Sequence, residues 1–393
     1  MSPLRRISNR VLLLVVAAVA VAALAAVVVV KASGGSGPTP PAKPLPQAIQ
    51  DALNAPKLDG ITARIQFTNH LIASGSLGGT SSPLLSGATG RLWATADGRL
   101  RLELQSDAGD AQVLSDGKTL TVYDASSNTV YKVALPAQTP DTGAKDSTHA
   151  TPTLAKIEEA LTQLGEYANL SGATPDTVAG QAAYTVHLSP KHDGGLLGAV
   201  EVGWDAVRGV PLRAAIYAQG DSSPVLELTV TDITYGPVAA ADVNITPPAG
   251  AKVVDLSPPS SSSKAGDKKT PPVTGAAAVA AAVPFTLQAP DTLVGLPRKE
   301  VRLIDSGGSP GAAVIYGQGL GAIVVLERKP DAKAGTSGPL GQLPTVTIGG
   351  ATGHELPTAL GTLIQVEKGG VAYTIVGSLP SVAAEAAASA LVP

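Results

Sequence analysis

The side chains that most often do chemistry are sparse in this chain and do not form a recognisable metal site. The sequence contains five histidines and no cysteine. His187 and His192 are the only close pair, on either side of Ser189-Pro190 at what is predicted to be a strand end. Zinc sites usually combine Cys and His ligands at short, regular spacings. We therefore expect no bound metal.

One stretch matches the serine-hydrolase elbow in form, Gly307-Gly-Ser-Pro-Gly311. In such an elbow the residue after the nucleophile donates its backbone N–H to the oxyanion. Pro310 occupies that place and has no N–H. The residues that follow, 312–316, also read as a strand rather than as the helix that an elbow opens. The stretch is better explained as a turn, and we expect no enzymatic activity.

Glycine-rich loops that could hold a cofactor phosphate fail on spacing as well. Gly117-Lys-Thr119 has the end of a phosphate loop, but Gln112 stands where that motif needs its first glycine. Gly317, Gly319 and Gly321 lie between two predicted strands, where turn glycines are expected. We predict no cofactor.

Composition narrows the class of partner. The net charge is −3, hydrophobic residues make up 44% of the chain and charged residues 15%. Proteins that bind nucleic acid carry clustered Lys and Arg, which this chain lacks, so nucleic acid is not an expected partner. The absence of cysteine excludes disulfides and a lipid-modified N-terminal cysteine.

The N-terminal segment predicts the compartment. Arg5, Arg6 and Arg10 precede residues 11–30, which are all Val, Leu or Ala. Twenty such residues in a helix span about 30 Å, the thickness of a bilayer core. We expect residues 1–31 to be a cytoplasmic tip and single-pass membrane anchor, with the rest extracytoplasmic. A cleaved signal peptide is the alternative, since Val30-Lys-Ala32 resembles a cleavage site.

Residues 32–46 are rich in Gly, Ser and Pro and are predicted to be a linker, followed by a helix over residues 47–54. Turn signals then recur about every ten residues, as in an antiparallel meander. We expect strands at residues 61–69, 90–95, 99–105, 111–114, 119–124 and 129–134. A second set is expected at residues 182–188, 199–205, 210–219 and 225–232, with a further candidate at 242–245.

A segment with helical periodicity separates the two sets of strands. Over residues 153–165 the apolar residues Leu154, Ile157, Leu161 and Leu164 fall on one stripe. This stripe is expected to lie against the apolar face of the sheet, either as a permanent plug or as a movable lid.

A second Ser- and Pro-rich linker is predicted at residues 257–282, and a smaller α+β domain at residues 283–393. Its expected strands are residues 285–287, 300–304, 312–316, 322–328, 345–348, 361–367 and 371–377. An Ala-rich helix is expected at residues 381–391, with Ser381 as its cap.

The first meander is apolar on one side only. Leu100, Leu102 and Leu104 alternate with charged residues, and Asp116-Gly117 is a strong hairpin signal. Trp93 is out of phase with Leu92, so one of the two faces away from the apolar side. Such a face either packs into a solid core or encloses an apolar ligand. The candidate lining residues are Trp93, Leu100, Leu102, Leu104, Leu120, Val122, Ile157, Leu161, Leu164 and Trp204.

Several blocks in residues 47–256 resemble the LolA-like periplasmic carriers, a half-barrel superfamily that includes the RseB/MucB sensors. They are Gly90-Arg-Leu-Trp93, Leu114-Ser-Asp-Gly-Lys-Thr-Leu-Thr-Val-Tyr-Asp124, Ala182-Ala-Tyr-Thr-Val-His-Leu-Ser-Pro190, Leu226-Glu-Leu-Thr-Val-Thr-Asp-Ile-Thr234 and Val243-Asn-Ile-Thr-Pro-Pro-Ala-Gly250. The stretch Val371-Ala-Tyr-Thr-Ile-Val-Gly-Ser-Leu-Pro380 looks like a domain of unknown function that is appended to such proteins in Gram-positive bacteria.

The resemblance implies a mainly β fold, an antiparallel half-barrel with a helical lid over a cavity that holds acyl chains. It implies binding of lipid or lipoprotein acyl chains for transport or presentation, as in lipoprotein sorting to the outer membrane. An RseB-like sensor that binds a membrane anti-sigma factor is the alternative. The arginine that locks the lid of the carriers would align near Ala96 and is absent here, so their gating need not transfer.

Overall fold

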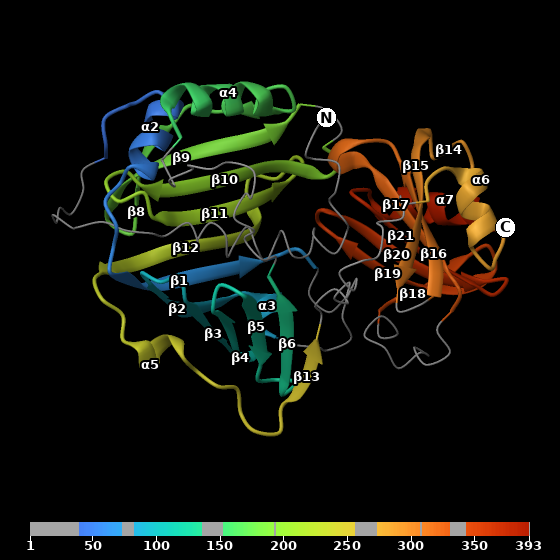
Figure 1. The fold of residues 1–393 in the computed structure, drawn as a ribbon, viewed down its shortest axis with the longest axis horizontal. Coiled ribbons are helices and arrows are strands. Elements are labelled where there is room, and N and C mark those ends of the chain that lie inside the picture. Colours follow the sequence, from blue (N-terminus) through green and yellow to red (C-terminus); the bar gives the residue numbers. More distant parts are fainter. Residues whose placement is uncertain are drawn as a thin grey trace, which may run out of the picture.

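The computed structural model describes residues 39–72, 82–135, 152–191, 194–255, 273–306, 309–330 and 343–392. These residues form two β units, the first up to residue 255 and the second from residue 273, as Figure 1 shows. The anchor expected at residues 11–30 lies outside the described residues. Within them, no helix has the length and apolar character needed to cross a bilayer.

In the described part of the first unit, 13 strands form a single sheet. Its first six strands are β1 (Gly60–Asn69), β2 (Ala88–Thr95), β3 (Leu100–Ser106), β4 (Gly109–Ser115), β5 (Thr119–Asp124) and β6 (Thr129–Ala134). The others are β7 (Ala168–Leu170), β8 (Thr174–Val178), β9 (Gln181–Pro190), β10 (Leu197–Asp205), β11 (Pro211–Ala218), β12 (Pro224–Tyr235) and β13 (Lys252–Asp255).

Strand β1 joins the two meanders, because it pairs with β2 on one side and with β12 on the other. The strand order is β13-β6-β5-β4-β3-β2-β1-β12-β11-β10-β9-β7, with β8 also paired to β9. All of these pairs are antiparallel except β13 with β6. Strands β9–β12 and β3–β6 run in different directions in Figure 1, so the sheet curves. This is the open antiparallel half-barrel that was expected.

The hairpin at Asp116-Gly117 shows how local sequence sets the register of the meander. The Asp116 carboxylate accepts the backbone N–H groups of Lys118 and Thr119, at 2.8 and 2.6 Å. These two hydrogen bonds lower the pKa of Asp116. Gly117 has φ of 81°, a conformation that costs glycine little. The turn places Leu120 opposite Ser115 and Val122 opposite Val113.

Four helices accompany the large sheet among the described residues: α2 (Leu45–Leu53), α3 (Pro83–Ser86), α4 (Leu154–Leu164) and α5 (Ala240–Val243). The helices predicted at residues 47–54 and 153–165 correspond to α2 and α4. The strand predicted at residues 242–245 is wrong, since residues 242 and 243 belong to α5 and residues 244 and 245 are in no strand. Strand β12 already has partners on both sides, β1 and β11, so the chain after it finds no free edge there.

The end of the linker predicted at residues 32–46 belongs to the folded unit. The Tyr184 hydroxyl donates to the Pro41 carbonyl at 2.7 Å. Lys43 forms a bridge with Ala173 and an ion pair of 2.6 Å with Asp51 of α2. The chain is therefore tied to the sheet before α2 begins.

Among its described residues, the second unit has a sheet of eight strands, two α-helices, α6 (Ala276–Ala282) and α7 (Ser381–Leu391), and a short 3-10 helix at Gly319–Gly321. The strands are β14 (Thr292–Leu293), β15 (Leu296–Ser306), β16 (Ser309–Tyr316), β17 (Ile323–Arg328), β18 (Thr345–Ile348), β19 (Ala351–Thr358), β20 (Gly361–Lys368) and β21 (Val371–Gly377). Their order is β14-β15-β16-β17-β21-β20-β19-β18, and all pairs are antiparallel.

Three expectations for the second unit need correction. Residues 276–282, which were expected to be linker, form α6, because Val279 is buried in the core of this unit. Residues 285–287 do not form a strand, although Phe285 and Leu287 pack against that core. Ser381 is the first helical residue of α7, and Pro380 holds the cap position.

The two units touch where β10 begins and β1 ends. The backbone N–H of Leu196 donates to the Ser378 hydroxyl at 2.8 Å. The backbone N–H of Ala359 donates to the Leu71 carbonyl, also at 2.8 Å. A Cβ at Gly195 would lie 2.5 Å from Ser378, so this approach requires glycine. The contact fixes one end of the large sheet against the second unit.

Candidate functional site

The apolar face predicted from the first meander is present and continuous. Leu92, Leu102, Val113 and Val122 lie in register across β2, β3, β4 and β5. Leu100, Leu102, Leu104 and Leu120 are buried in one core cluster, and Val122 packs against it while partly exposed. We call this side of the large sheet the inner face. Here the protein's own side chains pack closely together.

Helices α2 and α4 accompany a second cluster on the inner face. Leu45 and Ala48 of α2 pack with Tyr184, Val186 and Trp204, and the Tyr184 and Trp204 rings lie 6.1 Å apart. Leu161 of α4 packs against the same cluster. Ile157 is buried, whereas Leu164 is 39% exposed. The predicted stripe of α4 is thus only partly covered.

Trp93 does not line the inner face, which corrects its selection as a candidate. Leu92 faces inward, so Trp93 points to the opposite side of the sheet, which we call the outer face. There the Arg101 guanidinium lies 4.8 Å from the centre of the indole ring. Arg101 also donates to the Asp242 carbonyl of α5 at 3.2 Å. The indole therefore contributes to a cation–π contact on the outer face.

Between the two buried clusters, the inner face carries a band of apolar side chains, most of which are only partly buried. One row of this band runs in register through Val186, Val202, Ala214, Leu228 and Phe67, from β9 to β1. Val202, Ala214 and Phe67 in this row are partly accessible.

A second row runs through Leu188, Val200, Ile216 and Leu226. Its first three members are also partly accessible. We call the two rows the inner strip. It lies near the end of the sheet where Leu71 and Leu196 contact the second unit. The strip is the part of the inner face that a ligand could reach with the least disturbance of the core.

The inner-face residues selected from the sequence lie mostly in its buried part, and none of them belongs to the strip. Trp204 is the selected residue that lies next to it. The signal was present, since Val200, Val202 and Trp204 alternate with Glu201 and Gly203. What the sequence lacked was the pairing of β1 with β12, which sets Phe67 opposite Leu228.

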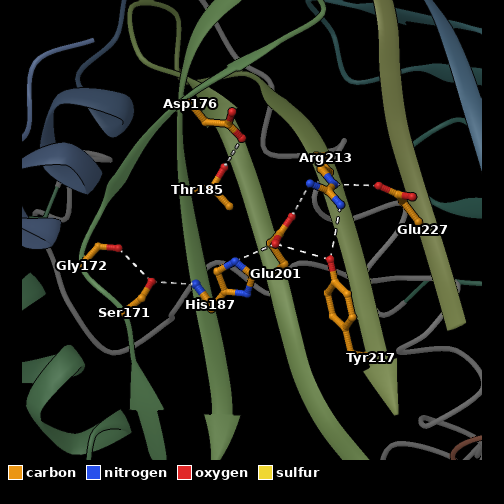
Figure 2. Close-up of polar contacts among 9 residues, drawn as sticks. All are labelled: Ser171, Gly172, Asp176, Thr185, His187, Glu201, Arg213, Tyr217 and Glu227. Carbon is orange, nitrogen blue, oxygen red and sulfur yellow. Dashed lines mark hydrogen bonds and ion pairs between the residues drawn. The ribbon is translucent and has the colours of Figure 1, made fainter. Parts of the chain in front are cut away.

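The outer face behind the strip carries a network of charged side chains (Figure 2). The Arg213 guanidinium lies 2.8 Å from Oε1 of Glu201 and 2.7 Å from Oε1 of Glu227. Nε2 of His187 lies 2.7 Å from the other Glu201 oxygen, Oε2. These side chains point toward one another from four successive strands, β9 to β12.

Tyr217 completes this network. Its hydroxyl lies 3.3 Å from Arg213 and 3.5 Å from Glu201. Burial, together with the charge of Glu201, raises the pKa of Tyr217, so it stays a neutral phenol. The pKa of Arg213 is also raised, because the attraction of Glu201 and Glu227 outweighs the opposing effect of burial. The network binds the four strands together electrostatically.

The network does not have the arrangement of a catalytic triad. The Ser171 hydroxyl accepts the backbone N–H of His187 at 2.9 Å and donates to the Gly172 carbonyl. It is therefore engaged with main chain, whereas a triad serine bonds the imidazole ring. In the part of the chain that the structure describes, no three His, Asp or Glu side chains are grouped so that they could hold a metal ion.

No protein-family model and no curated protein matches the sequence. Solved structures do show similarity. The chain is similar to the Pseudomonas aeruginosa MucA/MucB complex, with 14% identity over 87% of this chain and 95% of that chain and a TM-score of 0.38.

A putative outer membrane lipoprotein-sorting protein domain from Vibrio parahaemolyticus is 10% identical over 51% of this chain and 95% of its own, with a TM-score of 0.23. A LolA superfamily protein from Nitrosomonas europaea is 10% identical over 52% of this chain and 99% of its own, with a TM-score of 0.22. The families that the sequence resembles are thus also found among the similar solved structures.

Proposed function

We propose that this protein binds lipid or lipoprotein acyl chains along the inner strip, for transport or presentation at the cell envelope. The observation that carries the proposal is the inner strip itself, a two-row band of aliphatic and aromatic side chains, most of them partly accessible. It lies between two buried clusters on one face of a curved sheet.

The chemistry of the strip selects an uncharged, flexible ligand. Both rows consist of Val, Leu, Ile, Ala and Phe, while the charged residues of the same strands project from the outer face. Each methylene group that such a surface removes from water contributes about 0.8 kcal/mol. An acyl chain gains this free energy at each methylene group along its length. A charged headgroup would instead lose its hydration, so it must stay outside the strip.

The proposed tether fits this role. An anchor at residues 11–30 would keep the first unit within reach of the membrane that contains its ligand. The connection from that segment to the fold is short, because the chain is already attached to the sheet at Pro41. Removal of the segment by cleavage would instead yield a diffusible carrier.

Mass spectrometry of organic extracts from the purified full-length chain tests the proposal. Wild type is expected to yield a bound lipid after detergent exchange, whereas Phe67→Asp should lose it because the substitution places a charge on the strip. Gln66→Asp is the matched control, since Gln66 is adjacent in β1 but exposed on the outer face. Lipid-free wild type, or equal lipid in both variants, would contradict the proposal.

A second candidate is a sensor that passes ligand occupancy to a membrane anti-sigma factor. The observation that favours it is the contact between the units, through Leu196 with Ser378 and Leu71 with Ala359. This contact lies at the same end of the sheet as the inner strip. A ligand there could alter how the second unit is held.

The sensor role is tested by replacing Gly195 with valine, which forces the main chain away from Ser378. Small-angle scattering should then report a larger radius of gyration, and binding of a membrane anti-sigma factor should change in affinity. Gly220→Val is the control, because its added side chain would meet open space. Unchanged scattering and unchanged binding would argue against this second role.

A further inference from the structure

A carboxylic acid is buried in the second unit, outside the site described above. Glu327 lies on β17, on the same face as Ile323 and Val325, and none of its surface is exposed. Its neighbours across the sheet are Ala312 of β16 and Tyr373 of β21. No other Glu or Asp among the described residues of this unit is buried to this degree.

Only one of the two carboxyl oxygens of Glu327 has a partner. Oε2 accepts the backbone N–H of Gln288 at 2.9 Å, whereas Oε1 is buried without a hydrogen bond. Burial raises the pKa of Glu327 to about 7, and the bond from Gln288 offsets only part of this effect. A carboxylate with one free oxygen is costly in such a place, so the neutral acid is the form that fits.

The segment that covers Glu327 is residues 283–290, which we call the strap. It joins α6 to β14 and packs on the core of the second unit through Val283, Phe285, Leu287 and Ala289. Arg298 of β15 donates a side-chain hydrogen bond to the Ala289 carbonyl. The strap pairs with no strand among the described residues, so these contacts and the Gln288 bond hold it in place.

Among the described residues, no cation forms an ion pair with Glu327, although Lys329 and Lys368 line the groove beside it. Strand β16 contributes Tyr316 and β21 contributes Tyr373, and burial raises the pKa of each, that of Tyr316 to about 12. Arg298, the β15 cation that contacts the strap, is paired with Asp291 at 2.7 Å. Helices α6 and α7 face the core with apolar residues: Val279, Ala384, Ala387, Ala388 and Leu391.

The strap is also one wall of a groove of about 620 Å³. Pro284, Phe285, Thr286 and Gln288 form this wall, and the opposite side is formed by Lys329, Tyr373 and the turn that joins β20 to β21. Tyr373 thus both lines the groove and pairs with Glu327 across the sheet. Any displacement of the strap changes the shape of the groove.

We propose that the strap is a proton-dependent closure of this groove, held shut by the neutral form of Glu327 and released when that carboxyl ionises. Lifting the strap lets water reach Oε1 and Oε2, and it opens the groove by removing one wall. In the closed state the carboxyl group of Glu327 keeps its proton and stays uncharged.

The direction of the pH effect follows from linkage. The pKa of Glu327 is about 7 when the strap is closed and returns toward the ordinary value for Glu, about 4.3, once the strap lifts and the carboxyl is hydrated. Between these two values the closed form holds one more proton than the open form. The equilibrium constant for closing the strap therefore falls by up to about tenfold per pH unit as pH rises through this window, and it levels off above about pH 7.

Hydrogen–deuterium exchange of the full-length chain between pH 5 and pH 8 tests the proposal. The readout is protection of the peptide spanning residues 283–291, corrected for the intrinsic pH dependence of exchange. A peptide from β20, which is paired on both sides, is the internal reference. Wild-type protection of the strap should fall by up to about a hundredfold from pH 5 to pH 7. Glu327→Gln should keep it high and independent of pH.

Glu367→Gln is the matched control, because Glu367 is an exposed carboxylate on the neighbouring part of the sheet. It should retain the wild-type pH response. Constant protection in wild type, or a pH response that persists in Glu327→Gln, would overturn the proposal. Should that variant not fold, a carbon-13 NMR titration of the wild-type Glu carboxyls decides, and an apparent pKa near the ordinary value for Glu327 would equally refute it.

Discussion

Nε2 of His187 lies 2.7 Å from Oε2 of Glu201, and the two residues are paired directly across β9 and β10. The pair is asymmetric in its access to water, since the histidine side chain is 49% exposed and the glutamate side chain 4%. If the contact is broken, water can hydrogen-bond to the exposed His187 in place of Glu201. Water cannot reach the buried Glu201 carboxylate, which therefore depends on its contacts with His187, Arg213 and Tyr217. The stability of the outer face depends on the partners of Glu201.

Arg213→Met should destabilise the first unit by about 3 kcal/mol, because it leaves Glu201 and Glu227 without their shared cation in a largely buried position. Urea denaturation followed by tryptophan fluorescence measures the loss, since both tryptophans lie in this unit. Arg64→Met is the control, because Arg64 is an exposed arginine of β1 on the same outer face of the sheet. This variant should change stability by less than about 0.5 kcal/mol. Equal effects would show that the network adds nothing.

His187→Gln should cost less than about 1 kcal/mol in the same assay, because the His187 side chain is half exposed and water can take its place at little cost. Glutamine can still donate a hydrogen bond toward Glu201. A loss as large as that of Arg213→Met would mean that the imidazole, and not the guanidinium, holds the buried carboxylate.

Gly209→Ala tests how closely α2 packs against the loop before β11. Gly209 has φ of 65°, and an added Cβ would lie 2.3 Å from the Ala52 carbonyl oxygen at the end of α2. We expect a loss of about 3 kcal/mol, of which about 1 reflects the left-handed backbone and the rest displacement of the helix. Gly220→Ala separates the two, because it has φ of 86° and open space around the new Cβ. Thermal unfolding of both variants gives the difference.

Local sequence predicted most of the first sheet because its strands are neighbours in the chain. The alternation from β2 to β6 and the turn at Asp116-Gly117 were sufficient to set strands β5 and β6 at the bounds that the structure shows. Strand β19 was missed, since it contains Pro357, His354 and Glu355 and is defined by its partners β18 and β20. Pairing with neighbours outweighed the weak local preference.

The strap shows the opposite error. Phe285 and Leu287 alternate as in a strand, and this pattern predicted one, yet the segment crosses a core face without a pairing partner. An alternating apolar pattern reports which side chains are buried and not what the backbone bonds to. For Trp93 the pattern could not decide the face, because Leu92 and Trp93 are both apolar and both buried.

Acid should weaken the first unit in part through Asp116. The pKa of this carboxyl is lowered by the N–H groups of Thr119 and Lys118, so its contribution is present above its unfolded value, about 3.9. The contribution is lost as pH falls from there through the folded pKa. Asp116→Asn keeps an acceptor for the turn and removes the titration. The slope of unfolding free energy against pH below about 4 should therefore be smaller in this variant, and an unchanged slope would exclude Asp116 as a source.

Leu102→Ala and Ile216→Ala distinguish a packed core from a ligand surface on the same inner face. Leu102 is 6% exposed within the cluster, so its truncation leaves a cavity and should cost about 3 kcal/mol. Ile216 is partly accessible, and the same truncation there should cost about 1 kcal/mol. Lipid retention should show the reverse order, with the larger loss in Ile216→Ala, as measured in extracts of folded protein. If stability and lipid retention fall in the same order, the inner strip is ordinary core, and the ligand site must be sought on another surface.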